Sequence, residues 1–226
     1  MRQLLVFILA VGLFSACSKD DEKVEVKDYN LKTFEADLAY DAAAEHGTVQ
    51  YTRQTYFSFN SATPVETGTY GTDTWTDFFL VPDTSAYNVS TDVQDWDLLL
   101  SFYTEALDDE GTIIPYGVVG VLINTGENIK VGKIEYTDSE DPTAIADAFA
   151  ALTPGDVGSL GYSGDINAIG HTWKSFSLSQ MVYTVNSNWF YIVKLGNGDV
   201  YKLRFTGFYG TSTSQRVIKF EYQLMQ

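Results

Sequence analysis

The sequence predicts a mainly β fold of antiparallel sheets, with one short helix and a three-stranded meander near the carboxy terminus. Two observations support this prediction. Aromatic residues are abundant, at 15 Tyr, 14 Phe and 4 Trp, and together with frequent Thr and Val they favour strands over helices. In addition, apolar and polar residues alternate along segments of the last third, which is the periodicity of a half-buried strand.

The amino end reads as a secretory leader that stops at Cys17, the only cysteine of the chain. Arg2 supplies a positive charge, residues 4–14 are uncharged and mostly apolar, and two small residues precede the cysteine. The apolar run is too short for a bilayer, which takes about 20 helical residues to cross. The segment resembles a bacterial lipoprotein signal, and we therefore expect removal of residues 1–16 and lipidation of Cys17.

Residues 17–30 are expected to be the lipidated cysteine and a charged tether. The run Lys19-Asp20-Asp21-Glu22 resembles the signal with which certain Gram-negative gut and oral bacteria carry lipoproteins to the cell surface, and a plain solvated linker is the alternative. Several acyl chains on one cysteine anchor stably, because each buried CH₂ adds about 0.8 kcal/mol. The expected location is the outer membrane, with the protein exposed at the cell surface.

Residues 31–226 are expected to form a single β domain. A chain of this length buries roughly 70% of its unfolded surface, so a core can form without disulfides. Removing residues 1–16 takes away one basic residue, Arg2, and leaves 13 basic against 30 acidic residues, a net charge of −17 with His neutral. Nucleic acid is not an expected partner, because phosphate binding needs clustered Lys and Arg.

In the first half of the domain, turn residues and apolar runs mark the expected elements. A polar stretch at 41–47 ends a short first element, and the folded body is expected from about Thr48. The elements that follow are one or two strands over 48–59 broken by the polar residues 52–54, a loop with Pro64 and Gly68, strands over 75–81 and 96–103, and a turn at 108–111. Residues 98–100 are all Leu, as in a strand covered on both faces. Residues 116–123 and 129–136 are predicted to form a hairpin across 124–128.

One helix is predicted over about 142–152. Asp141 can cap it, Pro142 suits the first helical position, and Pro154 with Gly155 ends it. Apolar residues recur along it with helical spacing, at Ile145, Ala148, Phe149 and Leu152.

The last third of the chain predicts the three-stranded meander. A turn at 196–198 joins the first two strands. The apolar faces of the three strands consist of Trp189, Tyr191, Val193 and Leu195, then Tyr201, Leu203 and Phe205, then Ile218, Phe220, Tyr222 and Leu224.

Little in the sequence could support catalysis. The two histidines, His46 and His171, lie outside any nucleophile elbow, zinc-binding helix or ligand cluster, and no Gly-rich phosphate loop is present. Acidic groups at Asp95 with Asp97, and at 138–141, could serve a glycosidase or bind calcium, but the EF-hand spacing is absent. Such residues are usually strand-edge and loop carboxylates, so we expect a protein that is not an enzyme.

Several segments resemble, in the same order, the HmuY-type haem-binding lipoproteins of the same bacteria. They are Tyr56-Phe57-Ser58-Phe59, then Trp96-Asp97-Leu98-Leu99-Leu100, then Trp173 with Phe176, then residues 198–209, and finally the closing strand 218–222. The resemblance covers most of the mature chain, and residues 198–209 are its most specific part. It implies a mostly antiparallel β protein that takes haem from host haemoproteins and passes it to an outer-membrane receptor.

The resemblance also implies that two axial side chains hold the haem iron, either a pair of His or, in some relatives, Met. The second ligand falls within 175–183, where Met181 is the only soft ligand, and the first falls around 146–150, where the chain has no His, Met, Cys or Tyr. Three alternatives stay open: five-coordinate iron, recruitment of Tyr162 or His171, and no haem at all. Met181 could instead fill a gap in the core, and His171 could be an ordinary surface histidine.

The expected function is that of a surface-anchored lipoprotein that binds haem, or a similar iron carrier, and delivers it to a TonB-dependent haem receptor. Two alternatives belong to other classes. One is a surface module that binds a glycan or another small ligand through exposed aromatic residues. The other is an adhesive or structural lipoprotein that contacts only proteins.

Overall fold

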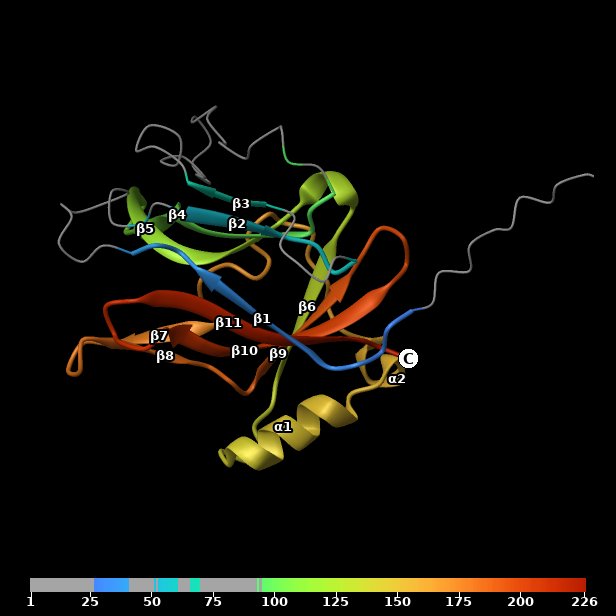
Figure 1. The fold of residues 1–226 in the computed structure, drawn as a ribbon. Helices are drawn as coiled ribbons and strands as arrows, with labels where there is room; N and C mark the ends of the chain where they lie inside the picture. Colours follow the sequence, from blue (N-terminus) through green and yellow to red (C-terminus); the bar gives the residue numbers. More distant parts are fainter. Residues whose placement is uncertain (1–26, 41–50, 52, 61–65, 70–92, 94) are drawn as a thin grey trace, which may run out of the picture.

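The computed structural model describes residues 27–40, 51, 53–60, 66–69, 93 and 95–226. In this part, the chain forms two antiparallel sheets, a two-stranded hairpin and two helices (Figure 1). The strands are β1 (Lys32–Asp37), β2 (Arg53–Phe57), β3 (Glu66–Thr69), β4 (Leu98–Asp109), β5 (Thr112–Ile123), β6 (Lys130–Glu135), β7 (Lys174–Ser177), β8 (Val182–Val185), β9 (Trp189–Lys194), β10 (Val200–Tyr209) and β11 (Arg216–Leu224). The helices are α1 (Pro142–Ala151) and α2 (Pro154–Val157), with a single 3₁₀ turn at Thr125–Glu127. Within these residues, no helix has the length and apolar character needed to cross a membrane.

The carboxy-terminal strands confirm the predicted meander. β9, β10 and β11 are successive antiparallel neighbours, and β1 and β6 extend them into a five-stranded sheet of order β1-β11-β10-β9-β6. Tyr201 lies opposite Val193 on one side and Leu224 on the other, so the apolar residues of the three strands share one face. The other sheet has the order β3-β2-β4-β5 and lies above the five-stranded sheet in Figure 1.

The main core fills the space between these two sheets. Phe57 of β2 packs edge-on against Phe220 of β11, with ring centroids 5.2 Å apart. Leu98 and Leu100 of β4 belong to this core, whereas Leu99 belongs to a second cluster on the other face of the same sheet. All three leucines are fully buried, which confirms the prediction of a strand covered on both faces.

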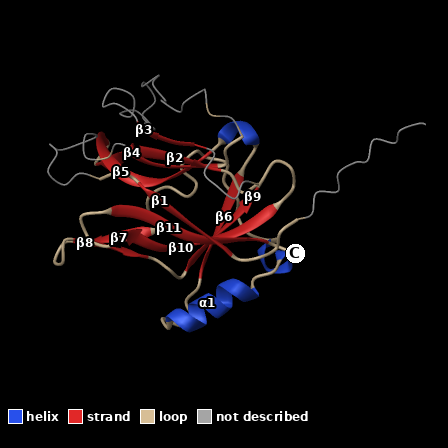
Figure 2. Cartoon of the chain, in the orientation of Figure 1, coloured by secondary structure: helices blue, strands red, loops and turns tan. Residues whose placement is uncertain are grey.

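Helix α1 covers the face of the five-stranded sheet that points away from the main core (Figure 2). The Asp141 side chain accepts a hydrogen bond from the N–H of Thr143 at 3.0 Å, and Pro142 is the first helical residue. Phe149 packs against Phe190 of β9, with ring centroids 5.3 Å apart. The predicted helix and its cap are therefore confirmed.

The predicted hairpin between residues 116–123 and 129–136 is wrong. β5 pairs along its whole length with β4, whereas β6 pairs with β9 in the other sheet. The cause lies in the connection, where Asn124 caps the 3₁₀ turn and its amide donates to the carbonyl oxygen of Trp96 at 2.8 Å. The chain is thereby fixed against the end of β4 and crosses from one sheet to the other.

Two further expectations are corrected. Arg53 and Gln54 do not interrupt a strand but belong to β2. Gln54 is buried, and its amide donates to Ser101 Oγ of β4 at 3.0 Å, so a polar residue is satisfied inside the sheet. The folded body also begins well before Thr48, because β1 is already an edge strand paired with β11.

Several sequence predictions fall on residues outside the described part of the chain. They concern the leader at 1–16, Cys17, the tether up to residue 26, His46, Thr52, Pro64 and the strand over 75–81.

The edge of β5 is held by a close backbone approach that requires glycine. Gly120 lies beside Gly170, and the neighbouring Val121 exchanges two backbone hydrogen bonds with Gly170, at 2.9 and 3.0 Å. A Cβ at position 120 would lie 2.5 Å from the carbonyl oxygen of Gly170. Gly120→Ala should therefore lower the free energy of unfolding by about 1–3 kcal/mol, measured by urea denaturation. Gly158→Ala is the control, because a Cβ there meets nothing within 4 Å, and equal stabilities of the two variants would contradict the prediction.

Candidate functional site

The hairpin β7–β8 projects from the end of the molecule opposite the C terminus (Figure 1). At its base, Trp173 is fully buried and stacks on Phe205 of β10, with ring centroids 4.2 Å apart. Tyr183 of β8 packs edge-on against Phe208, and its backbone N–H donates to the hydroxyl of Tyr209 at 2.7 Å. Aromatic contacts thus attach the base of the hairpin to the five-stranded sheet.

The tip of this hairpin exposes large apolar side chains. Phe176, Leu178 and Met181 are 43%, 81% and 70% exposed, which rules out Met181 as a gap-filling core residue. Met181 also has a φ of 55°, in the left-handed region that residues with a Cβ adopt only at a cost. Residues 175–185 contain no Asp, Glu, Lys or Arg, although the whole chain is strongly acidic. The tip is therefore an uncharged apolar patch that packing among the described residues does not explain.

Lys174 lies at the base of the hairpin with its ammonium group buried. Nζ donates to the carbonyl oxygens of Val119 in β5 and of His171, the latter at 3.5 Å. Burial lowers the pKa of Lys174 to about 7. Nζ also lies 4.5, 5.2 and 4.9 Å from the ring centroids of Trp173, Tyr183 and Phe208. The hairpin is thus joined to the edge of the four-stranded sheet through a cation that is costly to bury.

His171 connects two side chains of the neighbouring β-hairpin, β4–β5. Its Nε2 lies 3.3 Å from the hydroxyl oxygen of Tyr116, and its Nδ1 lies 3.6 Å from Oε1 of Glu105. Glu105 also accepts hydrogen bonds from the Tyr103 hydroxyl at 2.8 Å and the Asn167 amide at 3.4 Å. We call Tyr116, His171 and Glu105 the Tyr-His-Glu cluster.

The charges of this cluster depend on each other. Burial by itself would raise the pKa of Glu105, but the hydrogen bonds from His171, Tyr103 and Asn167 outweigh it and lower the pKa. Burial and the negative charge of Glu105 raise the pKa of Tyr116. The carboxylate is therefore ionised at neutral pH while the phenol keeps its proton.

Tyr162, the third candidate ligand, lies beside α2. Its hydroxyl donates to the carbonyl oxygen of Val157 at 2.9 Å, and Lys194 Nζ lies 3.6 Å from the centroid of its ring. Tyr162 therefore packs α2 against the five-stranded sheet. The structure does not bring it together with Met181 or His171.

Residues 146–150, where the resemblance places the first iron ligand, belong to α1. This helix packs through Phe149 on β9, outside the main core, and Figure 1 shows it apart from the hairpin β7–β8. An iron held at the hairpin therefore receives no ligand from α1.

The acidic residues that the sequence suggested for catalysis differ in burial and in their hydrogen bonds. Asp97 is buried and accepts hydrogen bonds from the N–H of Phe59 at 2.7 Å and from Ser58 Oγ at 3.1 Å, which joins two of the segments that carry the family resemblance. Asp95 is exposed, and Asp141 caps α1. Among the described residues, no group of three or more His, Cys, Asp or Glu is placed to hold a metal ion.

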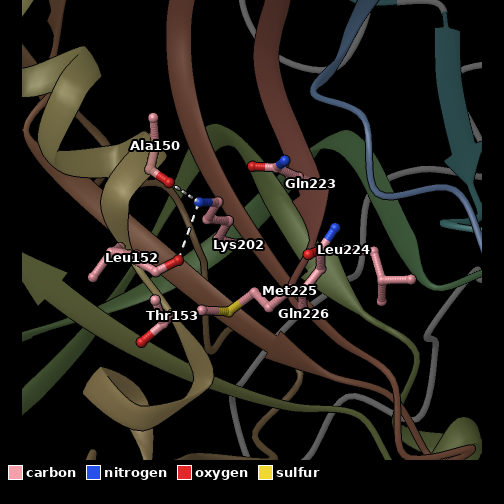
Figure 3. Close-up of a pocket in the computed structure, with 8 residues that line it drawn as sticks. All are labelled: Ala150, Leu152, Thr153, Lys202, Gln223, Leu224, Met225 and Gln226. Atoms are coloured by element: carbon pink, nitrogen blue, oxygen red, sulfur yellow. Dashed lines mark hydrogen bonds between the residues drawn. The ribbon is translucent and has the colours of Figure 1, made fainter.

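A small cavity of about 240 Å³ lies between the end of α1 and the end of β11 (Figure 3). Lys202 in its wall donates to the carbonyl oxygens of Ala150 at 2.7 Å and Leu152 at 3.2 Å, and so completes the C-terminal end of α1. Ligand pockets usually measure about 300–1,000 Å³, so this cavity is too small for a macrocycle. It is lined by Ala150, Leu152, Thr153, Lys202, Gln223, Leu224, Met225 and Gln226.

Sequence reasoning missed Tyr116, Glu105 and Lys174. A signal for the first two was present, because Gly111, which has a φ of 87°, marks the turn between β4 and β5. Counting back from that turn places Glu105 directly opposite Tyr116. Lys174 gave no such signal, since lysines are almost always exposed.

The fold and this site define an all-β protein whose distinctive surface is an exposed apolar hairpin. The family model described as HmuY protein matches residues 50–222, and the chain belongs to the HmuY family. The comparison with curated proteins finds no match.

Two solved structures illustrate what the chain resembles. Apo PinO from Porphyromonas gingivitis is 14% identical, with a TM-score of 0.47, and the match covers 88% of this chain and 99% of that chain. The apo HmuY analog of Tannerella forsythia is also 14% identical, with a TM-score of 0.38, and the match covers 88% of this chain and 98% of that chain.

Proposed function

We propose that this chain binds haem, or a similar flat iron carrier, beside the hairpin β7–β8 and delivers it to a TonB-dependent receptor in the outer membrane. The observation that carries the proposal is the exposure of Phe176, Leu178 and Met181 at the tip of one hairpin, where no residue is charged. Membership of the HmuY family supports haem as the ligand. The lipid expected on Cys17 would keep the protein beside its receptor, and no chemistry is performed on the ligand.

The energetics of the hairpin tip fit a surface that becomes covered. Full burial of a Leu, Phe or Met side chain is worth about 1.5–3 kcal/mol. In the free protein Leu178 and Met181 lack most of that gain, and Phe176 lacks part of it. Met181 adds the cost of its left-handed backbone, and strain of this kind is concentrated at functional sites. A macrocycle laid on the tip would recover the lost burial, and the thioether of Met181 could also reach a haem iron.

Met181→Gly separates stability from binding. Glycine adopts a positive φ readily, so the variant should be as stable as the wild type or up to about 1 kcal/mol more stable. It should nevertheless bind haemin more weakly, because the exposed side chain is lost. The measurement is a titration of haemin into the purified domain from Ser18 onward, followed by the shift of the Soret band, with urea denaturation in parallel.

The control for this titration is Met225→Leu, which changes a methionine in the wall of the small cavity. We expect the wild type and this control to saturate near one equivalent of haemin. No saturable shift in the wild type would exclude haem as the ligand. Equal affinities of Met181→Gly and the wild type would remove Met181 from the site.

A glycan is the second candidate ligand, because Tyr116 and Phe176 are 37% and 43% exposed and aromatic faces also stack on sugars. Binding on a glycan array that Phe176→Ala abolishes, with haemin inert, would support this function. If neither ligand binds, the adhesive alternative remains, and recovery of protein partners from outer membranes by the anchored chain tests it.

A further inference from the structure

The Tyr-His-Glu cluster pairs two accessible groups with one buried charge. Tyr116 is 37% exposed, and the side chains of His171 and Glu105 are 28% and 10% exposed. The phenol and the imidazole are therefore open to a ligand, whereas the carboxylate behind them is shielded from water. A carboxylate in such a place costs desolvation energy, and the fold offsets this cost with hydrogen bonds from Tyr103 and Asn167.

The order of the three groups defines where the protons lie. The carboxylate of Glu105 faces Nδ1 of His171, which favours the tautomer that carries its proton on Nδ1. Nε2 is then an acceptor, and the hydroxyl of Tyr116 is its donor at 3.3 Å. The imidazole is thus oriented to receive the phenolic proton.

We propose that the hydroxyl oxygen of Tyr116 is an axial ligand of ferric haem iron, with His171 and Glu105 as positioning residues. The inference rests on the proposed function, because it requires haem as the ligand. A phenolate oxygen is one of the side-chain ligands by which proteins hold haem iron. Tyr116 would also supply the iron with a protein ligand that α1 does not offer.

Binding of the Tyr116 oxygen to the iron needs no oxidant or reductant. The O–H bond of Tyr116 breaks, its proton passes to Nε2 of His171, and an Fe–O bond forms as the water on the ferric iron leaves. The iron stays ferric. The imidazolium produced faces the carboxylate of Glu105, so the charge separated in this step is compensated inside the cluster.

The surroundings of Tyr116 suit an apolar macrocycle. Ile114, two residues along the same face of β5, is 41% exposed. The cluster adjoins the base of the hairpin, because Lys174 contacts the carbonyl oxygen of His171 and that of Val119, three residues from Tyr116. In the proposed complex the apolar tip of the hairpin would cover the macrocycle, and Met181 would contact the macrocycle without being the iron ligand.

Tyr116→Phe tests the assignment, because it removes the hydroxyl and keeps the exposed ring. The wild-type complex with haemin should show the phenolate vibrations of an iron-bound tyrosine in its resonance Raman spectrum, and the variant should lose them. Its dissociation constant for haemin should rise by about tenfold or more, and that of Glu105→Gln by roughly tenfold, the usual effect of an outer-shell partner.

Tyr29→Phe is the matched control, since Tyr29 is also 37% exposed but lies outside the cluster, and it should retain the wild-type spectrum and affinity. Circular dichroism confirms that each variant is folded. Saturable haemin binding with no phenolate signature, or with a signature that Tyr116→Phe keeps, overturns the inference and leaves the proposed function standing. A spectrum of imidazole-bound iron that His171→Ala abolishes assigns the ligand to His171 instead. No saturable binding by the wild type overturns both proposals.

Discussion

Replacing Trp173 with Ala is expected to lower the free energy of unfolding by about 3–5 kcal/mol, the usual cost of truncating a fully buried Trp. Trp173 is 0% exposed. Its ring stacks on Phe205 and meets Phe208 edge-on, with centroids 4.2 and 5.6 Å away. Lys174 also lies over this ring, so the cavity left by the variant would open beneath the whole hairpin β7–β8. The measurement is urea denaturation followed by circular dichroism.

Two further variants make this prediction specific. Trp173→Phe should cost clearly less, because the indole N–H has no acceptor among the described residues and the ring contacts are partly kept. Trp189→Ala removes the same side chain from a half-buried position under Lys133, and it should also cost less than Trp173→Ala. Equal losses for Trp173→Ala and Trp189→Ala would show that the hairpin is not anchored through Trp173.

The elements that the sequence predicted correctly are those whose signals are local. Helix α1 has its cap, its first-turn proline and its apolar stripe within one short segment, and the meander has a tight turn and short connections. Pairing between distant segments is not encoded in this way. β6 joins β9 because the Asn124 cap redirects the chain, and nothing in the alternation of β5 and β6 distinguishes that partner from a hairpin.

The candidate site also has one part that the sequence could indicate and one part that it could not. The segment with Met181 was singled out by the family resemblance, and the structure adds that the Met181 side chain is exposed and its backbone strained. The Tyr-His-Glu cluster joins three separate stretches of chain. Its β4–β5 register follows from the turn at Gly111, but the approach of His171 depends on the contact between Gly120 and Gly170. Only the fold reveals that contact.

Stability between pH 7 and pH 9 should depend strongly on Lys174. The folded protein holds this lysine with a pKa lowered to about 7 by burial, whereas the unfolded chain holds it with a pKa of about 10.4. Between these two values the unfolded state binds the proton and the folded state does not. The free energy of unfolding therefore rises with pH in this window, by roughly 2 kcal/mol from pH 7 to pH 9.

Stability rises with pH because the folded protein loses a charge that is costly to bury. Below pH 7 both states carry the proton, and the folded protein bears the full desolvation cost of the ammonium. Among the described residues Lys174 forms no ion pair, and its partners are carbonyl oxygens and ring faces. Above pH 7 the folded state loses the proton and is relieved of that cost. Tyrosines with raised pKa values, such as Tyr103 and Tyr191, oppose this trend only near pH 10 and above.

Lys174→Met tests whether Lys174 causes the rise in stability, because Met has a similar length and no charge. The variant should lack the rise in stability between pH 7 and 9, so its advantage over the wild type should be largest near pH 7 and shrink as the pH increases. Lys194→Met is the control, since it removes the same charge from a half-buried lysine over Tyr162, and its profile should follow that of the wild type. If the wild type and Lys174→Met run parallel from pH 7 to 9, the ammonium stays protonated in the folded state. The three rings and the Val119 carbonyl would then offset its burial, and Lys174 would be a permanent cation at the base of the hairpin β7–β8.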